Sequence, residues 1–202
     1  SLPVYRMAAV FCCLRVCWGG TGLKAGHVQL SDLPSVKLDT ESMGHDVVIL
    51  KNGRRICGTG GALANSPINQ DKAYFEIKIQ SSGTWGVGVA TKKVKLGTVP
   101  LGGDTESWVL RNDGKLVHNE EERGKLAELP QEGDILGLTY DHVELNFYLN
   151  GQPLNTPFTG IKGTVYPVFY VDDSATIDVQ FSNFYHTPPS GFEEIMIEKS
   201  LL

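Results

Sequence analysis

The sequence predicts an all-β fold, an antiparallel β-sandwich with short terminal arms. In residues 75–80 the apolar Phe75, Ile77 and Ile79 alternate with polar residues, and residues 143–150 repeat the pattern. This period of two is typical of a half-buried strand. The 23 glycines and 10 prolines are spread between such apolar runs, which indicates many turns and therefore many short strands. The 3.6-residue periodicity of a helix is almost absent.

Turn signals support the same fold. Asn52-Gly53 and Asn150-Gly151 are the dipeptides that favour two-residue type I′ hairpin turns. A third turn signal, Asn112-Asp113-Gly114, separates two short apolar segments, and Gly114 can adopt a positive φ there. Further strands are predicted from β-branched and aromatic residues at 134–140, 166–171 and 176–181.

Residues 85–90 form a strand with two different faces. Trp85, Val87 and Val89 make one apolar face, whereas Gly86, Gly88 and Ala90 leave the other nearly bare. Glycine weakens a strand unless another group approaches its backbone closely. We therefore expect a neighbouring strand, or a bulky side chain from the facing sheet, to lie against this bare face.

We assign residues 34–187 to the sandwich, 1–33 to an N-terminal arm and 188–202 to a C-terminal arm. Residues 1–6 are excluded from the fold prediction, because Met7-Ala8-Ala9 resembles a natural start. No apolar run approaches the roughly 20 residues that span a bilayer, so no transmembrane segment is expected.

Composition and motifs disfavour several functions. A net charge of −5 argues against nucleic acid as the main partner, because phosphate neutralisation needs a basic surplus. The run Gly58-Thr59-Gly60-Gly61 lacks the Lys-Ser/Thr of a phosphate loop. The five histidines are scattered without metal-ligand spacing, and no serine lies in a nucleophile elbow. We therefore expect no enzyme activity, cofactor or metal.

Cys12, Cys13 and Cys17 crowd the N-terminal arm, and only Cys57 lies in the predicted domain. Disulfide frameworks of secreted proteins spread their cysteines across the core, so this pattern predicts a reducing, cytoplasmic location. The three arm cysteines are either inert thiols or sites of S-acylation, and membrane association is expected only if they are acylated.

Four groups of residues, in order along the chain, resemble the SPRY domain family. They are residues 74–79 with 85–90, residues 107–108 with 112–116, residues 133–137 with 145–151, and residues 166–167 with 179–181. The resemblance implies a bent, concanavalin-like or jelly-roll-like sandwich that recognises partner proteins through loops at one end. It implies no enzyme activity.

By this resemblance the partner-binding loops are residues 51–55, 91–104 and 171–174. Their charged residues are the candidate site: Lys51, Arg54, Arg55, Lys92, Lys93, Lys95, Asp172 and Asp173. The six cations form either a solvated loop surface or a rim that steers an acidic partner. The two aspartates are either turn formers or partner contacts. The best-understood peptide binders of the family carry aromatic or apolar residues where this chain has Asp172-Asp173-Ser174, so their peptide motif is not transferred.

The favoured function is a non-catalytic adaptor or scaffold that binds a short, possibly acidic, protein segment. The alternative is a carbohydrate-binding or enzymatic β-sandwich, which requires a cleft with paired acids or exposed aromatic residues for stacking. Trp85 and Trp108 lie in predicted strands, where packing in the core explains them.

Overall fold

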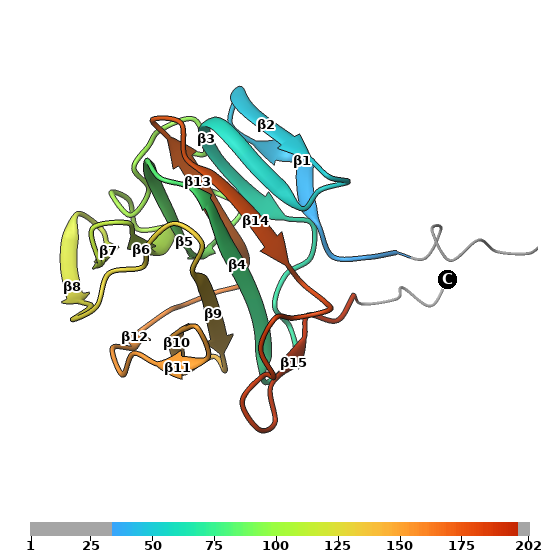
Figure 1. Ribbon diagram of the computed structural model, residues 1–202, viewed down its shortest axis with the longest axis vertical. Helices are drawn as coiled ribbons and strands as arrows, with labels where there is room; N and C mark the ends of the chain where they lie inside the picture. The colour runs from blue at the N-terminus through green and yellow to red at the C-terminus, as the bar shows by residue number, and fades with distance from the viewer. Residues whose placement is uncertain (1–33, 198–202) are drawn as a thin grey trace, which may run out of the picture. The chain divides into compact units, whose positions relative to one another are not determined.

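The computed structural model describes residues 34–197, so Cys12, Cys13 and Cys17 lie outside the described part of the chain. These residues form fifteen β-strands and no helix, which confirms the predicted fold class (Figure 1). The strands are β1 Leu38–Met43, β2 Asp46–Leu50, β3 Arg55–Ala64, β4 Ala73–Ser81, β5 Thr84–Ala90, β6 Ser107–Arg111, β7 Lys115–His118, β8 Glu121–Lys125, β9 Ile135–Tyr140, β10 Glu144–Leu149, β11 Gln152–Pro153, β12 Phe158–Thr159, β13 Tyr166–Asp172, β14 Thr176–Gln180 and β15 Glu193–Glu194.

The strands form two layers that share β3. Sheet A contains β1, the second half of β3, β13, β5, β6, β7 and β8. Sheet B contains β2, the first half of β3, β14, β4, β9, β10 and β11, with β12 beside β10 and β15 beside β4. Along the hydrogen-bonded order of the strands, β8 is the last strand of sheet A and β11 is the last strand of sheet B. Both lie on the left in Figure 1, because the sheet curls back on itself. Every pairing is antiparallel except that of β15 with β4.

The crossing between the layers is a bend in β3. Residues Arg55 and Ile56 pair with β14, whereas residues Gly60–Leu63 pair with β13. Between them Gly58 has a φ of 91° and Gly60 a φ of 132°. Residues with a Cβ rarely adopt these angles, so the two glycines allow one strand to serve both sheets.

The inward faces of the two sheets enclose the main core, as the alternation predicted. Phe75, Ile77 and Ile79 from β4 face Trp85, Val87 and Val89 from β5 within one buried cluster. On the opposite face of β5, the position of a Cβ on Gly86 is occupied by the ring of Tyr170, and that of Gly88 by the backbone of Trp108. Both groups belong to strands that neighbour β5 in the same sheet. The bare face is therefore covered by neighbouring strands, the first of the two predicted arrangements, and not by a side chain from the facing sheet.

The C-terminal part of the chain differs from the prediction. Part of the predicted arm, residues 188–202, belongs to the fold, because β15 pairs with β4 and Ile195 is 4% exposed in the main core. The preceding segment, residues 182–188, covers the polar face of β4. There Glu76 is fully buried and accepts hydrogen bonds from the backbone N–H groups of Tyr185 (2.7 Å) and His186 (2.9 Å) and from the hydroxyl of Tyr74 (2.8 Å).

Candidate protein-interaction site

The loop between β5 and β6, residues 91–106, covers the outer face of sheet A. Val94 and Leu101 from this loop are buried in a second, smaller core, which also contains Leu63, Ala90, Val109, Val168 and Tyr170 from the strands beneath. The carbonyl of Leu96 accepts a hydrogen bond of 2.7 Å from the N–H of Gly61 in β3. The loop is therefore held on the sheet, although its lysines remain at the surface.

The turn between β13 and β14 reaches the same bend of β3. The hydroxyl of Thr59 donates a hydrogen bond of 3.0 Å to the Oδ1 atom of Asp172. Asp173 and Ser174 are exposed and have φ values of 50° and 67°, so they form the tip of the turn. The structure thus brings two of the three predicted loops, 91–104 and 171–174, onto residues 59–61.

The three lysines of the β5–β6 loop are all exposed. The ammonium of Lys92 lies 5.2 Å from the centre of the Tyr166 ring, which orients that side chain along sheet A. No ion pair is found for Lys93 or Lys95 within the described residues. These two side chains give the loop its positive charge.

The third predicted loop, residues 51–55, is the turn between β2 and β3. Leu50 pairs with Arg55, so four residues form the turn, and Lys51, Asn52 and Gly53 all have positive φ. The predicted two-residue turn is therefore wrong at this position, whereas Asn150-Gly151 does form one, with φ values of 49° and 82°.

Asp178 of β14 binds two of the predicted site residues. Arg55 donates two hydrogen bonds to its carboxylate, one of them 2.8 Å long, and Lys51 donates another of 3.0 Å. The side-chain amide of Gln80 donates a further bond of 3.0 Å. Burial alone would raise the pKa of Asp178, but the bonds from Arg55 and Lys51 outweigh it and lower this pKa. Lys51 and Arg55 therefore have an internal counterion that the sequence did not indicate.

Asp178→Asn is expected to lower the free energy of unfolding at neutral pH by about 1–2 kcal/mol, because hydrogen bonds to a charged group are lost. A carboxyl with a lowered folded-state pKa stabilises the protein above its ordinary pKa of about 3.9, and this stabilisation is lost as the pH falls through the folded-state value. Urea unfolding should therefore show a weaker loss of stability in acid for the variant than for the wild type. Asp173→Asn, at an exposed turn position, should leave the acid dependence unchanged; an identical dependence in Asp178→Asn would contradict the assigned role.

The three predicted loops do not lie at one end of the sandwich. Leu96 lies beside Gly44 and Gly61, where β2 begins, whereas Lys51 follows the end of β2. Five strand residues separate these points, a length of about 16 Å. The six predicted cations therefore form two groups. Lys51, Arg54 and Arg55 lie at the β2–β3 turn, and Lys92, Lys93 and Lys95 lie over sheet A.

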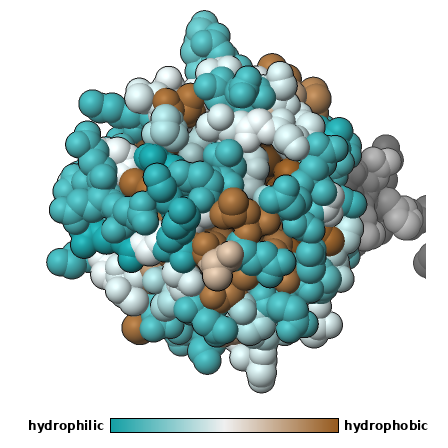
Figure 2. All heavy atoms as spheres, turned by 60° about the vertical axis from the view of Figure 1, so that its left-hand side comes forward, coloured by the Kyte–Doolittle hydropathy of each residue, from teal (hydrophilic) through white to brown (hydrophobic). Residues whose placement is uncertain are grey.

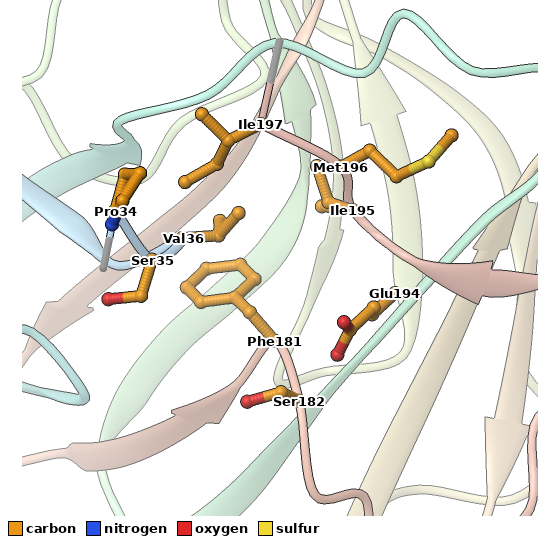
Figure 3. Close-up of a pocket in the computed structure, with 9 residues that line it drawn as sticks. All are labelled: Pro34, Ser35, Val36, Phe181, Ser182, Glu194, Ile195, Met196 and Ile197. Carbon is orange, nitrogen blue, oxygen red and sulfur yellow. The ribbon is translucent and has the colours of Figure 1, made fainter. Parts of the chain in front are cut away.

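Other features of the surface were not predicted. Figure 2, turned toward β7 and β8, shows a mostly hydrophilic surface interrupted by an apolar area. A largely apolar hollow of about 370 Å³ lies around Phe181. Figure 3 shows its lining, with Pro34 and Val36 from the start of the described residues and Ile195, Met196 and Ile197 from their end. The residues that line this hollow come from the first and the last part of the described sequence, so no local sequence pattern could have indicated it.

Within residues 34–197 there is no group of three or more His, Cys, Asp or Glu side chains that could hold a metal ion. None of these residues forms a helix that could span a bilayer. Trp85 and Trp108 are 3% and 5% exposed, which agrees with the predicted packing role.

Comparison with known proteins gives the same fold and a family. The model of the SPRY domain matches residues 72–184, and the curated relatives match nearly the whole chain. The chain belongs to the SPRY domain family. SPRY domain-containing protein 7 of Bos taurus is 62% identical over 197 residues, which are 96% of this chain and 98% of the relative. The proteins of that name from Gallus gallus and Homo sapiens are each 62% identical over 196 residues, with the same coverage.

Solved SPRY structures share the architecture at low sequence identity. The SPRY domain of human HERC1 has a TM-score of 0.60 and 19% identity, and covers 71% of this chain and 96% of that one. The PSpry domain of TRIM65 has a TM-score of 0.59 and 17% identity, with coverages of 72% and 89%. These likenesses confirm the β-sandwich. SPRY domains are in general protein-interaction modules, so the family agrees with the predicted class of function.

Proposed function

We propose that this SPRY domain is a non-catalytic cytoplasmic adaptor that binds a short segment of a partner protein. The proposed contact surface is the β5–β6 loop together with the β13–β14 turn. The observation that carries this proposal is that both segments contact residues 59–61, through the Gly61–Leu96 and Thr59–Asp172 hydrogen bonds. Loops fixed on a rigid sandwich are a common place for binding residues, because they vary without disturbing the core.

The charges on this surface suggest the chemistry of the partner. Lys93 and Lys95 are exposed cations on the loop, whereas Asp172 and Asp173 provide negative charge on the turn. Such a surface is complementary to a segment with acidic residues at one end and a polar or basic group at the other. Arg54, exposed in the β2–β3 turn, lies in the other cationic group and makes a separate candidate contact.

Lys93→Glu combined with Lys95→Glu is expected to lower the affinity for specific partners at least tenfold, because the double change reverses the charge that an acidic segment would meet. Charges at the rim of an interface act mainly on the association rate, so the loss should appear as a slower and less salt-sensitive association. The unfolding temperature should not change, since both side chains are exposed. Proximity labelling in cells would identify partners, and binding kinetics with a purified partner would measure the change.

Lys125→Glu with Lys162→Glu is the matched control, because it makes the same change of charge at two exposed positions outside the proposed surface. The acidic pair Glu120 and Glu121 is a poorer control, because the N–H of Glu120 donates a hydrogen bond to Gly102 of the β5–β6 loop. Arg54→Glu alone tests the other cationic group. If the control or Arg54→Glu loses the partners while the loop variant keeps them, the proposed surface is wrong.

A further inference from the structure

Three edge strands of the described part of the sandwich, β8, β11 and β1, are protected from pairing with other chains, whereas β2 is not. Natural edge strands carry charges, proline or irregular pairing, because a regular apolar edge recruits further strands. At one end of the strand order β8 bears four charged residues among five, and at the other end β11 has two residues, one of them Pro153. The edge strand β1 contains Asp39 and Glu41 and has an irregular register with β3.

Strand β2 lacks these features. Within Asp46–Leu50 the four residues after Asp46 are all apolar, with no lysine, proline or bulge. Among the described residues β2 pairs with β3 alone, so its other edge has no strand partner. Val47 and Ile49 pack against the core, whereas Val48 and Leu50 point outward and are 47% and 46% exposed. Two neighbouring apolar side chains on an open edge indicate a surface that another strand covers.

We propose that β2 pairs with β2 of a second copy of this chain. In an antiparallel pair, residues that face each other lie on the same side of the sheet. A two-fold axis at Ile49 then places Val48 beside Leu50 of the second copy, and Leu50 beside Val48 of the second copy. This register gathers the four exposed apolar side chains into one stripe and joins the two copies of sheet B.

The charges around β2 are complementary in the same arrangement. The exposed Asp46 is the first residue of β2, and the exposed Lys51 and Arg54 follow its end. Lys51 remains 53% exposed despite its bond to Asp178. Because an antiparallel pair reverses one strand, the acidic end of each copy meets the basic turn of the other. A two-fold interface repeats each such contact, so every favourable pair occurs twice.

Sedimentation equilibrium of the full chain over a concentration series tests this inference. The wild type should associate to a dimer. Val48→Lys with Leu50→Lys should remain monomeric at every concentration, because lysines would face lysines across the axis. Its unfolding temperature should match that of the wild type at dilutions where both are monomeric. Val143→Lys is the matched control, since Val143 is 67% exposed outside β2 and its replacement should leave the dimer intact. A monomeric wild type, or a dimer that persists in the double variant, would overturn the proposal.

Cysteine cross-linking tests the register. In a background with the four native cysteines replaced by serine, an oxidised mixture of Val48→Cys and Leu50→Cys chains should give more covalent dimer than either variant alone. Equal or absent cross-linking in the mixture would reject the Ile49 axis. This interface is separate from the proposed partner surface. A monomer that binds partners through Lys93 and Lys95 would refute the dimer and support the proposed function.

Discussion

Replacement of Glu76 by alanine is expected to lower the free energy of unfolding by about 3–5 kcal/mol, the range for breaking a buried charged network. The Glu76 carboxylate is fully buried and accepts three hydrogen bonds, two of them from backbone N–H groups of residues 182–188. Without it the N–H groups of Tyr185 and His186 and the hydroxyl of Tyr74 lose their acceptor. Each buried polar group left unsatisfied costs about 1–3 kcal/mol.

Urea unfolding and amide hydrogen exchange would measure this effect. Exchange at Tyr185 and His186 should become much faster in Glu76→Ala, because the bonds that hold this segment on β4 are gone. Val143→Ala is the control, since Val143 is 67% exposed and lies outside both β4 and residues 182–188. If Tyr185 and His186 keep their protection in Glu76→Ala, the carboxylate does not hold the segment.

Trp85→Ala is expected to cost about 3–5 kcal/mol, the range for truncating a large aromatic side chain in a core. Trp85 is 3% exposed and packs in the main core with Val87 and Val89 of the same strand. The side chains around Trp85 can fill the resulting cavity only in part, because the Tyr170 ring already packs against Gly86 on the other face of β5.

The midpoint of urea unfolding, measured at unchanged slope, reports this loss directly. Val143→Ala, at a position 67% exposed, should change the free energy of unfolding by less than about 0.5 kcal/mol. A midpoint in Trp85→Ala as close to the wild type as that of the control would show that the indole is not a core anchor.

Much of the fold could be predicted from local patterns. The alternation in residues 75–80 and 145–149 correctly indicated which side chains of β4 and β10 face the core, because successive side chains of a strand point to opposite sides. Val143, predicted on the same face, precedes β10 and is exposed. Asn150-Gly151 formed the expected turn, since its two positive φ angles are a property of the dipeptide itself. The bare face at Gly86 correctly indicated a close approach, although the approaching group, Tyr170, could not be named.

The candidate site was less accessible to sequence reasoning. Arg55 and Lys51 were counted as cations available to a partner, but their counterion, Asp178, lies more than 120 residues further along the chain. The resemblance to SPRY domains gave residues 51–55 and 91–104 the same role, whereas the pairing of β2 with β3 separates them. Neither fact has a local signal, since each depends on which strands become neighbours.

The sequence by itself determined the class of fold, the main strands, the Asn150-Gly151 turn and membership of the SPRY domain family, because these follow from side-chain periodicity, turn chemistry and ordered motifs. Only the tertiary structure decided that Glu76 is buried, that residues 193–194 form a strand, that Asp178 binds two predicted site residues and that β2 has an open apolar edge. The physical reason is common to all four. Burial and pairing of a polar or apolar group depend on which distant segment covers it, and that choice is made by the packing of the whole sandwich.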